Sequence, residues 1–231
     1  MKDTLDWIKN KPDTYIIGMG DYIEGINFTD PRFNPNSIPE EYLRRLADVV
    51  IFEKEELVKL LYPVRDRIIC MIEGNHERKV RDKYHYNVQK EICKDLNVKN
   101  ASPISYIRLK FPREYHTRSL VIHAYHGTHA PSEGTTALRQ LIQSSRNKEA
   151  DIFLCAHSHH LITTSEPYIS YGRSNLMQRK RYYGVTGSFL ESYTSKGENY
   201  VEMKGDNPRK IGVLRIDVYP QKKPLDIHMR C

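Results

Sequence analysis

Short, continuously apolar runs that each end in a polar turn constrain the fold of this sequence more than any other feature. They are YIIGMGD (15–21), IICMIEGN (68–75), LVIHAYHG (120–127) and DIFLCAHS (151–158). Runs of this kind, without polar alternation, are typical of strands whose two faces are both buried. Because stretches with helical periodicity lie between them, helices are expected to cover the strands. The pattern predicts the α/β class, with layered central mixed β-sheets flanked by helices.

Two long helical stretches are predicted. Ser37 and Glu40 have the spacing of a capping box, and apolar residues recur at helical intervals from there to Leu61. One long helix is therefore expected to begin at Ser37. Apolar residues at i, i+4 spacing from Val80 to Leu96 predict a second helix. Residues 150–160, by contrast, are interpreted as a strand that continues through the histidines at its end.

Length and composition indicate one ordinary globular domain. The chain has 231 residues, 39% hydrophobic and 28% charged, and no Pro-, Gly- or Ser-rich linker divides it, so a single domain covering 1–231 is expected. No apolar stretch approaches the roughly 20 residues needed to span a membrane. The first residues, MKDTLDWIKNK, lack the apolar centre of a signal peptide. A cytoplasmic location without a membrane partner is expected, and the oligomeric state is left open.

Positive charge is concentrated in one segment. The net charge of +7 is spread along the chain except in RSNLMQRKRYY (173–183), where Arg173, Arg179, Lys180 and Arg181 precede two tyrosines. Such mixtures of cationic and aromatic side chains occur on surfaces that bind nucleic acids. A solvated basic loop is the favoured interpretation, and nucleic acid is kept as a candidate partner.

Metal-ligating residue types collect where the predicted strands end: Asp21, Asn75, His76, His126, His157 and His159. Singly, each has a structural explanation such as a helix cap or a tight turn. Together they favour a metal site, because strands of a covered sheet bring their carboxyl ends to one crevice. In an extended chain alternate side chains share a face, so His157 and His159 are expected to point to one side and His160 to the other.

Four stretches, in this order, resemble the motifs of the calcineurin-like metallophosphoesterases of phage and prokaryotic type. They are GDYIE (20–24), GNHE (74–77), HG (126–127) and AHSH (156–159), and TGSFL (186–190) is similar to the strand that follows the last motif in such members. Ala156 stands where the family usually has glycine. The resemblance implies a layered metallophosphoesterase fold and a metal-dependent hydrolase of phosphoester bonds. The expected substrate is a phosphodiester, a nucleotide or a nucleic acid.

The resemblance also implies a set of metal ligands. Asp21 is the carboxylate expected to bridge two ions, and the second ion takes Asn75, His126 and His157, while the first takes His159. A bridging oxygen and imidazoles suit Mn²⁺, Fe or Zn²⁺ better than Mg²⁺ or Ca²⁺, and Mn²⁺ is favoured. One or two such ions would activate a water as the nucleophile and neutralise charge that develops on the phosphoryl oxygens.

Catalytic roles follow from the same resemblance. His76 is expected near the substrate as an acid or transition-state donor, and Glu24 is expected to orient it. Glu77 is assigned a bracing role in its loop. His123 and His129, which flank His126, are expected to pack or to support the ligands.

The family's first motif, Asp-x-His, does not occur ahead of Asp21. The resemblance then leaves the first strand missing and the first ion with only Asp21 and His159. We favour a shortened chain of an active parent over degeneration, or over a substitute ligand such as His129 or Glu133. Activity of this shortened chain is left open, and a degenerate, non-catalytic scaffold or binding protein of the same fold is the alternative function.

Overall fold

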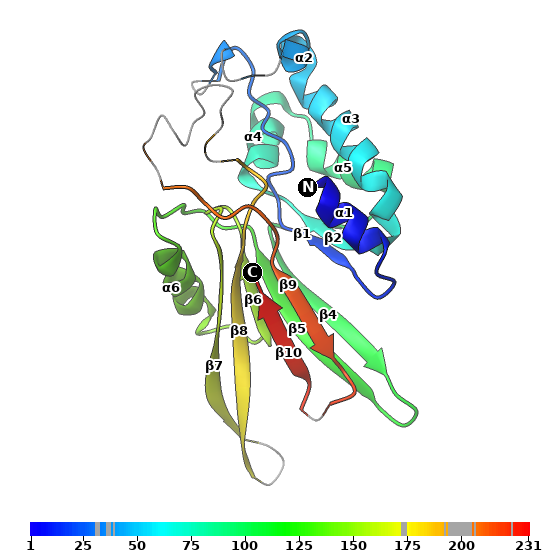
Figure 1. Cartoon of the computed structure of the whole chain (residues 1–231), viewed down its shortest axis with the longest axis vertical. Helices are drawn as coiled ribbons and strands as arrows, with labels where there is room; N and C mark the ends of the chain where they lie inside the picture. The colour runs from blue at the N-terminus through cyan, green and yellow to red at the C-terminus, as the bar shows by residue number, and fades with distance from the viewer. Residues whose placement is uncertain are drawn as a thin grey trace. The chain divides into compact units, whose positions relative to one another are not determined.

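The computed structural model describes residues 1–30, 33–35, 38, 40–171, 175–191, 193, 205, 207–222 and 224–231. The chain divides into two compact units. Unit 1 consists of Met1–Pro103 and Glu191–Pro208, and unit 2 consists of Ile104–Leu190 and Arg209–Cys231. Each unit is made of strands and helices that can be followed in Figure 1, and each has its own sheet.

Unit 1 alternates helices with three short strands. Its elements are α1 (Lys2–Lys9), β1 (Ile16–Gly18), α2 (Glu40–Leu43), η2 (Leu46–Asp48), α3 (Val49–Leu61), η3 (Tyr62–Arg67), β2 (Ile68–Ile72), α4 (Asn75–Tyr84), α5 (Val88–Leu96) and β3 (Asn100–Ala101). The sheet order is β1-β2-β3, and both pairings are parallel. Parallel neighbours require crossover connections, which the helices supply.

The core of unit 1 joins β2 to the helices that cover it. Met71 packs in one cluster with Val80 of α4 and with Val88, Ile92 and Leu96 of α5, all of them buried. Leu57 and Leu61 of α3 pack against the same cluster, and α3 lies beside α5 (Figure 1). This packing holds the carboxyl ends of β1 and β2, where the predicted site residues of unit 1 follow.

Unit 2 is built on a five-stranded mixed sheet. Its elements are β4 (Ile104–Pro112), β5 (Thr117–Tyr125), α6 (Gly134–Ser145), β6 (Ile152–Cys155), β7 (Leu161–Tyr171), β8 (Leu176–Thr186), β9 (Arg215–Tyr219) and β10 (Asp226–Arg230). The sheet order is β4-β5-β6-β8-β7, and β9 and β10 form an antiparallel pair. Helix α6 buries Leu141 against Phe153 of β6 and Tyr183 of β8. Strands β5 and β6 are parallel, so their carboxyl ends meet at one edge.

The predicted α/β class, with mixed central sheets flanked by helices, is confirmed. The strands that precede the candidate ligands do not belong to one sheet, however, because β1 and β2 lie in the sheet of unit 1 and β5 and β6 in that of unit 2. The expectation of a single domain over 1–231 stays a prediction.

Both long helices of the sequence analysis are interrupted. Between Glu40 and Leu61 the chain forms α2, η2 and α3 in place of one helix, and Ser37 lies outside the described residues. The stripe from Val80 to Leu96 is divided between α4 and α5. His85 ends α4 in the left-handed conformation, at φ 54°, and the side chain of Asn87 caps α5 by accepting the N–H of Lys90 at 2.9 Å.

The basic segment forms a strand, which corrects the prediction of a loop. Arg179, Lys180 and Arg181 lie in β8 and pair with residues of β7, while Arg173 lies outside the described residues. The Arg181 guanidinium stacks over the Tyr168 ring at 4.7 Å. Long apolar helices are absent from the described part of the chain, where none meets the requirements for crossing a membrane.

Candidate metal centre

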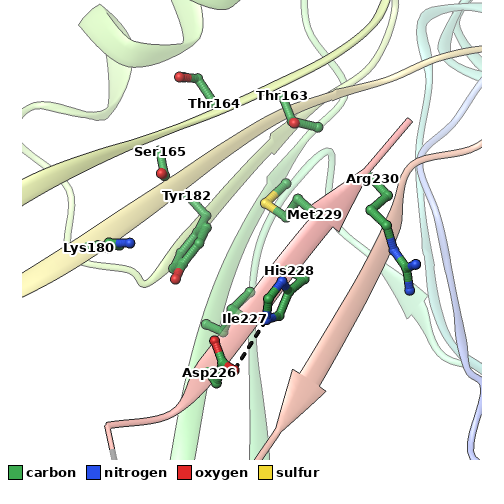
Figure 2. Close-up of a pocket in the computed structure, with 10 residues that line it drawn as sticks. All are labelled: Thr163, Thr164, Ser165, Lys180, Tyr182, Asp226, Ile227, His228, Met229 and Arg230. Carbon is green, nitrogen blue, oxygen red and sulfur yellow. Dashed lines mark ion pairs between the residues drawn. The ribbon is translucent and has the colours of Figure 1, made fainter.

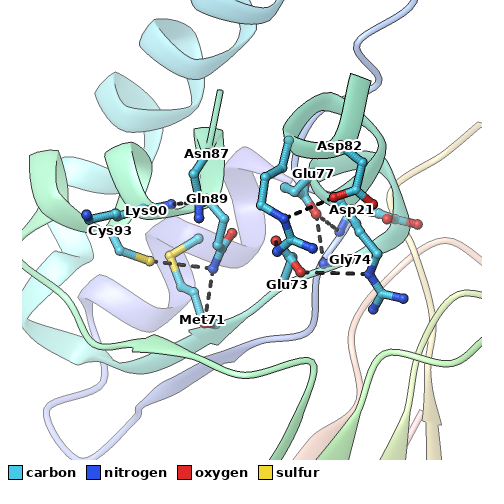
Figure 3. A network of polar contacts seen from close by, with 12 residues as sticks. Asp21, Met71, Glu73, Gly74, Glu77, Asp82, Asn87, Gln89, Lys90 and Cys93 are labelled. Carbon is cyan, nitrogen blue, oxygen red and sulfur yellow. Dashed lines mark hydrogen bonds and ion pairs between the residues drawn. The ribbon is translucent and has the colours of Figure 1, made fainter. Parts of the chain in front are cut away.

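Glu77 organises the loop that follows β1. Its buried carboxylate accepts the backbone N–H groups of Asp21 at 3.0 Å, Tyr22 at 2.6 Å and Ile23 at 3.2 Å. It also accepts the N–H of Gly74 at 2.9 Å, next to its own helix (Figure 3). One side chain therefore ties the 21–23 loop to the start of α4, and the bracing role expected for Glu77 agrees with these contacts.

The start of α4 is held against Asp21. The backbone N–H of His76 donates to Oδ1 of Asp21 at 3.1 Å. A Cβ at Gly74 would collide with the backbone nitrogen and Oδ1 of Asp21 and with Oε2 of Glu77. Only glycine allows this close approach of the two segments. Within unit 1 the structure thus brings Asp21 and the GNHE stretch together.

Negative charge is concentrated around Asp21. Burial raises the pKa of Glu77, and the nearby Asp21 carboxylate raises it further, although the three backbone N–H donors of Tyr22, Asp21 and Gly74 act in the opposite direction. Two carboxylates at close range are costly to ionise together. A bound cation would remove that cost, so this corner of unit 1 is chemically suited to a divalent metal ion.

His76 is oriented by the turn that follows Asp21. Its Nδ1 lies 2.9 Å from the carbonyl oxygen of Ile23 and 3.5 Å from Oε2 of Glu24. Because a carbonyl oxygen can only accept, Nδ1 is the protonated donor of this contact. Nε2 is then the nitrogen left for other partners. Glu24 and His76 are therefore close, and Asn75 is the first residue of α4.

In unit 2 the imidazoles of His126 and His157 are neighbours. His126 follows β5 and His157 follows β6, and their ring centroids lie 5.3 Å apart in an edge-to-face arrangement. The N–H of Ala156 donates to the carbonyl oxygen of His126 at 3.0 Å, which joins the two segments. Gly127 has φ 107°, and a Cβ there would lie 3.1 Å from both Sγ of Cys155 and Cβ of His157. Glycine after His126 is thus required by the packing.

The histidine-rich stretch at 157–160 is a turn, which corrects the prediction of a strand. Strand β6 ends at Cys155, and both His157, at φ 62°, and His159, at φ 59°, have left-handed backbones. The alternation of an extended chain does not apply to such residues. The turn is fastened by Arg209, whose Nη1 donates to the carbonyl oxygen of Ser158 at 2.9 Å. His160 has a structural contact, with Nε2 3.0 Å from the carbonyl oxygen of Pro131.

The other two histidines near this site differ in environment. His123 is buried and packs edge-on against Tyr106, at 4.9 Å between ring centroids, and against Phe153 at 5.6 Å. Neither of its ring nitrogens has a hydrogen-bond partner among the described residues. Burial lowers its pKa, and the positive charge of Lys148 lowers it further. His129 is exposed, with Nδ1 2.8 Å from Oγ1 of Thr128.

Two residues near these segments escaped the sequence analysis. Glu53 of α3 accepts the N–H of Gly25 through Oε2 at 2.8 Å, behind the turn that contacts His76. Arg209 fastens the 157–160 turn. No local pattern marks either residue, because a glutamate on the polar side of a helix and an arginine in a loop normally face solvent.

An Asp-x-His does occur late in the chain, at Asp226 and His228 of β10, and the sequence analysis overlooked it. The two side chains pair with each other at 3.2 Å beside a pocket of about 340 Å³ (Figure 2). The pocket is also lined by Tyr182, which pairs with Ile152 at the start of β6, whereas His157 follows the end of that strand. Asp226 and His228 therefore do not replace the missing motif beside His157.

The sequence model of the calcineurin-like phosphoesterases matches residues 1–189. The chain belongs to the calcineurin-like phosphoesterase family, and the match runs through both units. That family comprises metal-dependent phosphoesterases, and it supports a divalent metal ion as cofactor and phosphoesters as substrates at the family level. Among curated proteins, none matches the chain significantly in sequence.

Similar solved structures include Vps29 from Entamoeba histolytica. The wild-type protein complexed with Zn²⁺ is 13% identical, with 93% of this chain and 96% of that chain covered, at a TM-score of 0.35. A single mutant is 15% identical, with 93% and 96% covered, at 0.37. A double mutant is 16% identical, with 93% and 97% covered, at 0.38. At these scores the likeness says nothing about the activity of this chain.

Proposed function

We propose that this chain is a metal-dependent hydrolase that acts on a phosphodiester, a nucleotide or a nucleic acid. Membership of the calcineurin-like phosphoesterases supports the class of reaction. The observation that carries the proposal for this chain is the edge-to-face pair of His126 and His157, which two parallel strands present side by side. Imidazoles in such a pair are typical ligands of transition metals.

The residues present fit a divalent transition metal. Asp21 offers a carboxylate oxygen, and His126 and His157 each offer an imidazole nitrogen. We propose these three as the central ligands, with the Asn75 amide and the His159 imidazole completing the set for one or two ions. This mixture of oxygen and nitrogen donors favours Mn²⁺, Fe or Zn²⁺. The crowded negative charge of Asp21 and Glu77 also supports a cation in this position.

The bound metal would supply an activated water and positive charge for the phosphoryl oxygens. The chain itself supplies the proton for the leaving group. We propose that His76 donates it from Nε2, because Nδ1 is anchored on the carbonyl oxygen of Ile23. Donation from Nε2 requires the imidazolium form, in which the N–H at Nδ1 faces the carbonyl oxygen of Ile23 and the Glu24 carboxylate, 3.5 Å away. His76 is therefore proposed as the general acid and Glu24 as the residue that orients it.

The charge of the chain supports a polyanionic substrate. The net charge is +7, and Arg179, Lys180 and Arg181 follow one another in β8. Consecutive residues of a strand point to alternate faces, so these three cations do not form one stripe. The net positive charge favours nucleic acid as a substrate class, but the arrangement of these three cations does not indicate which face of β8 would contact it.

Metal binding is the first experiment. Protein purified without chelator is expected to carry a transition metal by elemental analysis, and metal-free protein is expected to bind Mn²⁺ in calorimetry. Asp21→Ala and His157→Ala are expected to lose that binding, whereas the exposed His116→Ala serves as the control and is expected to keep it. Unchanged Mn²⁺ binding in both ligand variants would contradict the assignment.

Hydrolysis is the second experiment. With Mn²⁺ added, single-stranded DNA, cyclic nucleotides and p-nitrophenyl phosphate are offered as substrates. Cleavage of DNA or of a cyclic nucleotide that disappears in His157→Ala is the expected result. Turnover of the aryl phosphate alone would contradict the proposed substrate class. Metal binding without any hydrolysis would favour the alternative function, a non-catalytic binding protein of this family.

A further inference from the structure

Glu53 makes a half-buried polar contact in unit 1 that the sequence analysis did not anticipate. It lies on α3, and its Oε2 accepts the backbone N–H of Gly25 at 2.8 Å. Gly25 has a left-handed backbone, at φ 60°, and a Cβ there would lie 3.3 Å from Cγ2 of Val80. The turn at 23–25 is therefore held from one side by Glu53 and limited on the other by α4.

The same turn provides the contacts of the His76 ring that fix its orientation. Nδ1 of His76 meets the carbonyl oxygen of Ile23 at 2.9 Å and Oε2 of Glu24 at 3.5 Å. Glu24 itself is half exposed, with 54% of its side chain accessible, so burial does not hold it in place. The backbone of the turn sets where the Glu24 side chain begins, and two carboxylates bind this backbone, Glu77 at Ile23 and Glu53 at Gly25, next to Glu24.

The charges that act on Glu53 include those of Glu24 and His76. Burial raises the pKa of Glu53 to about 7, and the negative charge of Glu24 also raises it. The N–H groups of Gly25 and Glu24 and the positive charge of His76 act in the opposite direction. Glu53 thus interacts with both members of the Glu24–His76 pair, and its contact with the turn is more than incidental packing.

We propose that Glu53 is a positioning residue for His76. Its carboxylate holds the 23–25 turn, so that Ile23 and Glu24 keep Nδ1 of His76 anchored and leave Nε2 for the substrate. This inference rests on the proposed function of His76 as the proton donor. Glu53 itself touches neither substrate nor metal in this scheme, and its effect on the reaction passes through the orientation of the ring.

The first test is nuclear magnetic resonance of the metal-free chain with ¹⁵N-labelled histidine. The Nδ1 and Nε2 shifts of His76 are expected to report the Nδ1–H tautomer in the wild type. Glu53→Ala is expected to give a mixture of tautomers, and Glu53→Gln, which keeps an acceptor oxygen for Gly25, an intermediate result. Glu55→Ala, an exposed position on the same helix, is the control. An unchanged tautomer in Glu53→Ala would overturn the proposal.

The second test compares two diesters that differ only in the leaving group, methyl p-nitrophenyl phosphate and methyl phenyl phosphate. Nitrophenolate leaves without protonation, whereas phenolate benefits from an acid. Glu53→Ala is expected to lower kcat about tenfold on the phenyl ester and less than about twofold on the nitrophenyl ester. Equal losses on both esters would overturn the proposal. If the wild type hydrolyses neither of these esters, nor DNA, nor a cyclic nucleotide, the proposed function fails, whereas the tautomer measurement still decides the role of Glu53.

Discussion

Glu77 shows how a single side chain can hold two distant segments of the chain together. The N–H groups that it accepts, at Asp21, Tyr22, Ile23 and Gly74, come from two segments more than fifty positions apart. A buried carboxylate that satisfies several backbone donors leaves all of them unpaired when it is removed. The position of Asp21 therefore depends on a residue more than fifty positions away as well as on its own neighbours in sequence.

Glu77→Ala is expected to lower the free energy of unfolding by about 3 kcal/mol or more, because several buried N–H groups lose their acceptor. Urea denaturation followed by circular dichroism measures this change. Glu56→Ala, on the exposed side of α3, is the control and is expected to change stability by less than about 0.5 kcal/mol. Equal stability of the two variants would show that the Glu77 contacts contribute little.

His123 is expected to reduce stability as the pH falls. Its pKa in the folded chain is lowered, chiefly by burial, so the unfolded chain takes up the proton more readily. The neutral form contributes stability fully above the unfolded-state pKa of about 6.5, and this contribution is lost as the pH falls from there through the folded pKa. Protonation of His123 at low pH is therefore expected to destabilise the folded chain.

His123→Phe removes the two unpaired nitrogens and keeps a ring between Tyr106 and Phe153. The free energy of unfolding is expected to rise by about 1 kcal/mol at pH 7.5 and by more at pH 5.5. Urea denaturation at the two pH values tests this, with the exposed His116→Phe as the control. A gain that does not depend on pH would contradict the role of protonation.

At the scale of elements, the start of α4 is the most constrained point of unit 1. Gly74 has an extended backbone, at φ −90° and ψ −177°, which any residue can adopt, so the glycine is needed for space alone. Gly74→Ala is expected to lower the free energy of unfolding by about 2–3 kcal/mol and to weaken Mn²⁺ binding, because the added methyl group displaces Asp21. Denaturation and calorimetry measure both effects.

Gly134→Ala is the matched control for that substitution. The nearest atoms to a Cβ there belong to the side chain of His160, at 3.3 Å, and the position lies on a helix, which favours alanine. Stability and Mn²⁺ binding are expected to change little in this variant. Similar behaviour of the two alanine variants would mean that the space around Gly74 is less restricted than its neighbours suggest.

The elements themselves were largely predictable from local patterns. Apolar runs that end in polar turns identified β1, β2, β5 and β6, because burial on both faces leaves no polar positions within a strand. Helical periodicity gave a wrong prediction where the apolar pattern continues across the break between two helices. The i, i+4 stripe is uninterrupted across His85, and only the left-handed backbone of that residue separates α4 from α5.

At the scale of the whole molecule, the sequence offered candidate site residues but did not predict which sheets carry them. Strand pairing is non-local, so the assignment of β2 and β6 to different sheets had no signature in either segment. The roles of Glu53 and Arg209 depend equally on contacts between distant parts of the chain. The motifs were recognisable because few residue types can serve as metal ligands, whereas a supporting hydrogen bond can come from almost any polar residue.

Metal binding is expected to stabilise the folded chain, because the proposed ligands are far apart in sequence and are arranged for an ion only in the folded state. At about a hundredfold excess of Mn²⁺ over its dissociation constant, the free energy of unfolding should rise by about 2.7 kcal/mol. Thermal unfolding with and without Mn²⁺ measures the shift, which Asp21→Ala should abolish. A shift of the same size in that variant would place the ion elsewhere.

The left-handed backbones of Asp21, His157 and His159 have a consequence for engineering. This conformation costs a residue other than glycine roughly 1–2 kcal/mol. A directed-evolution campaign that selects only for heat resistance would therefore be expected to accumulate glycine or asparagine at these positions. The selected variants would be more heat-resistant than the parent and would lack side chains that are proposed here as metal ligands.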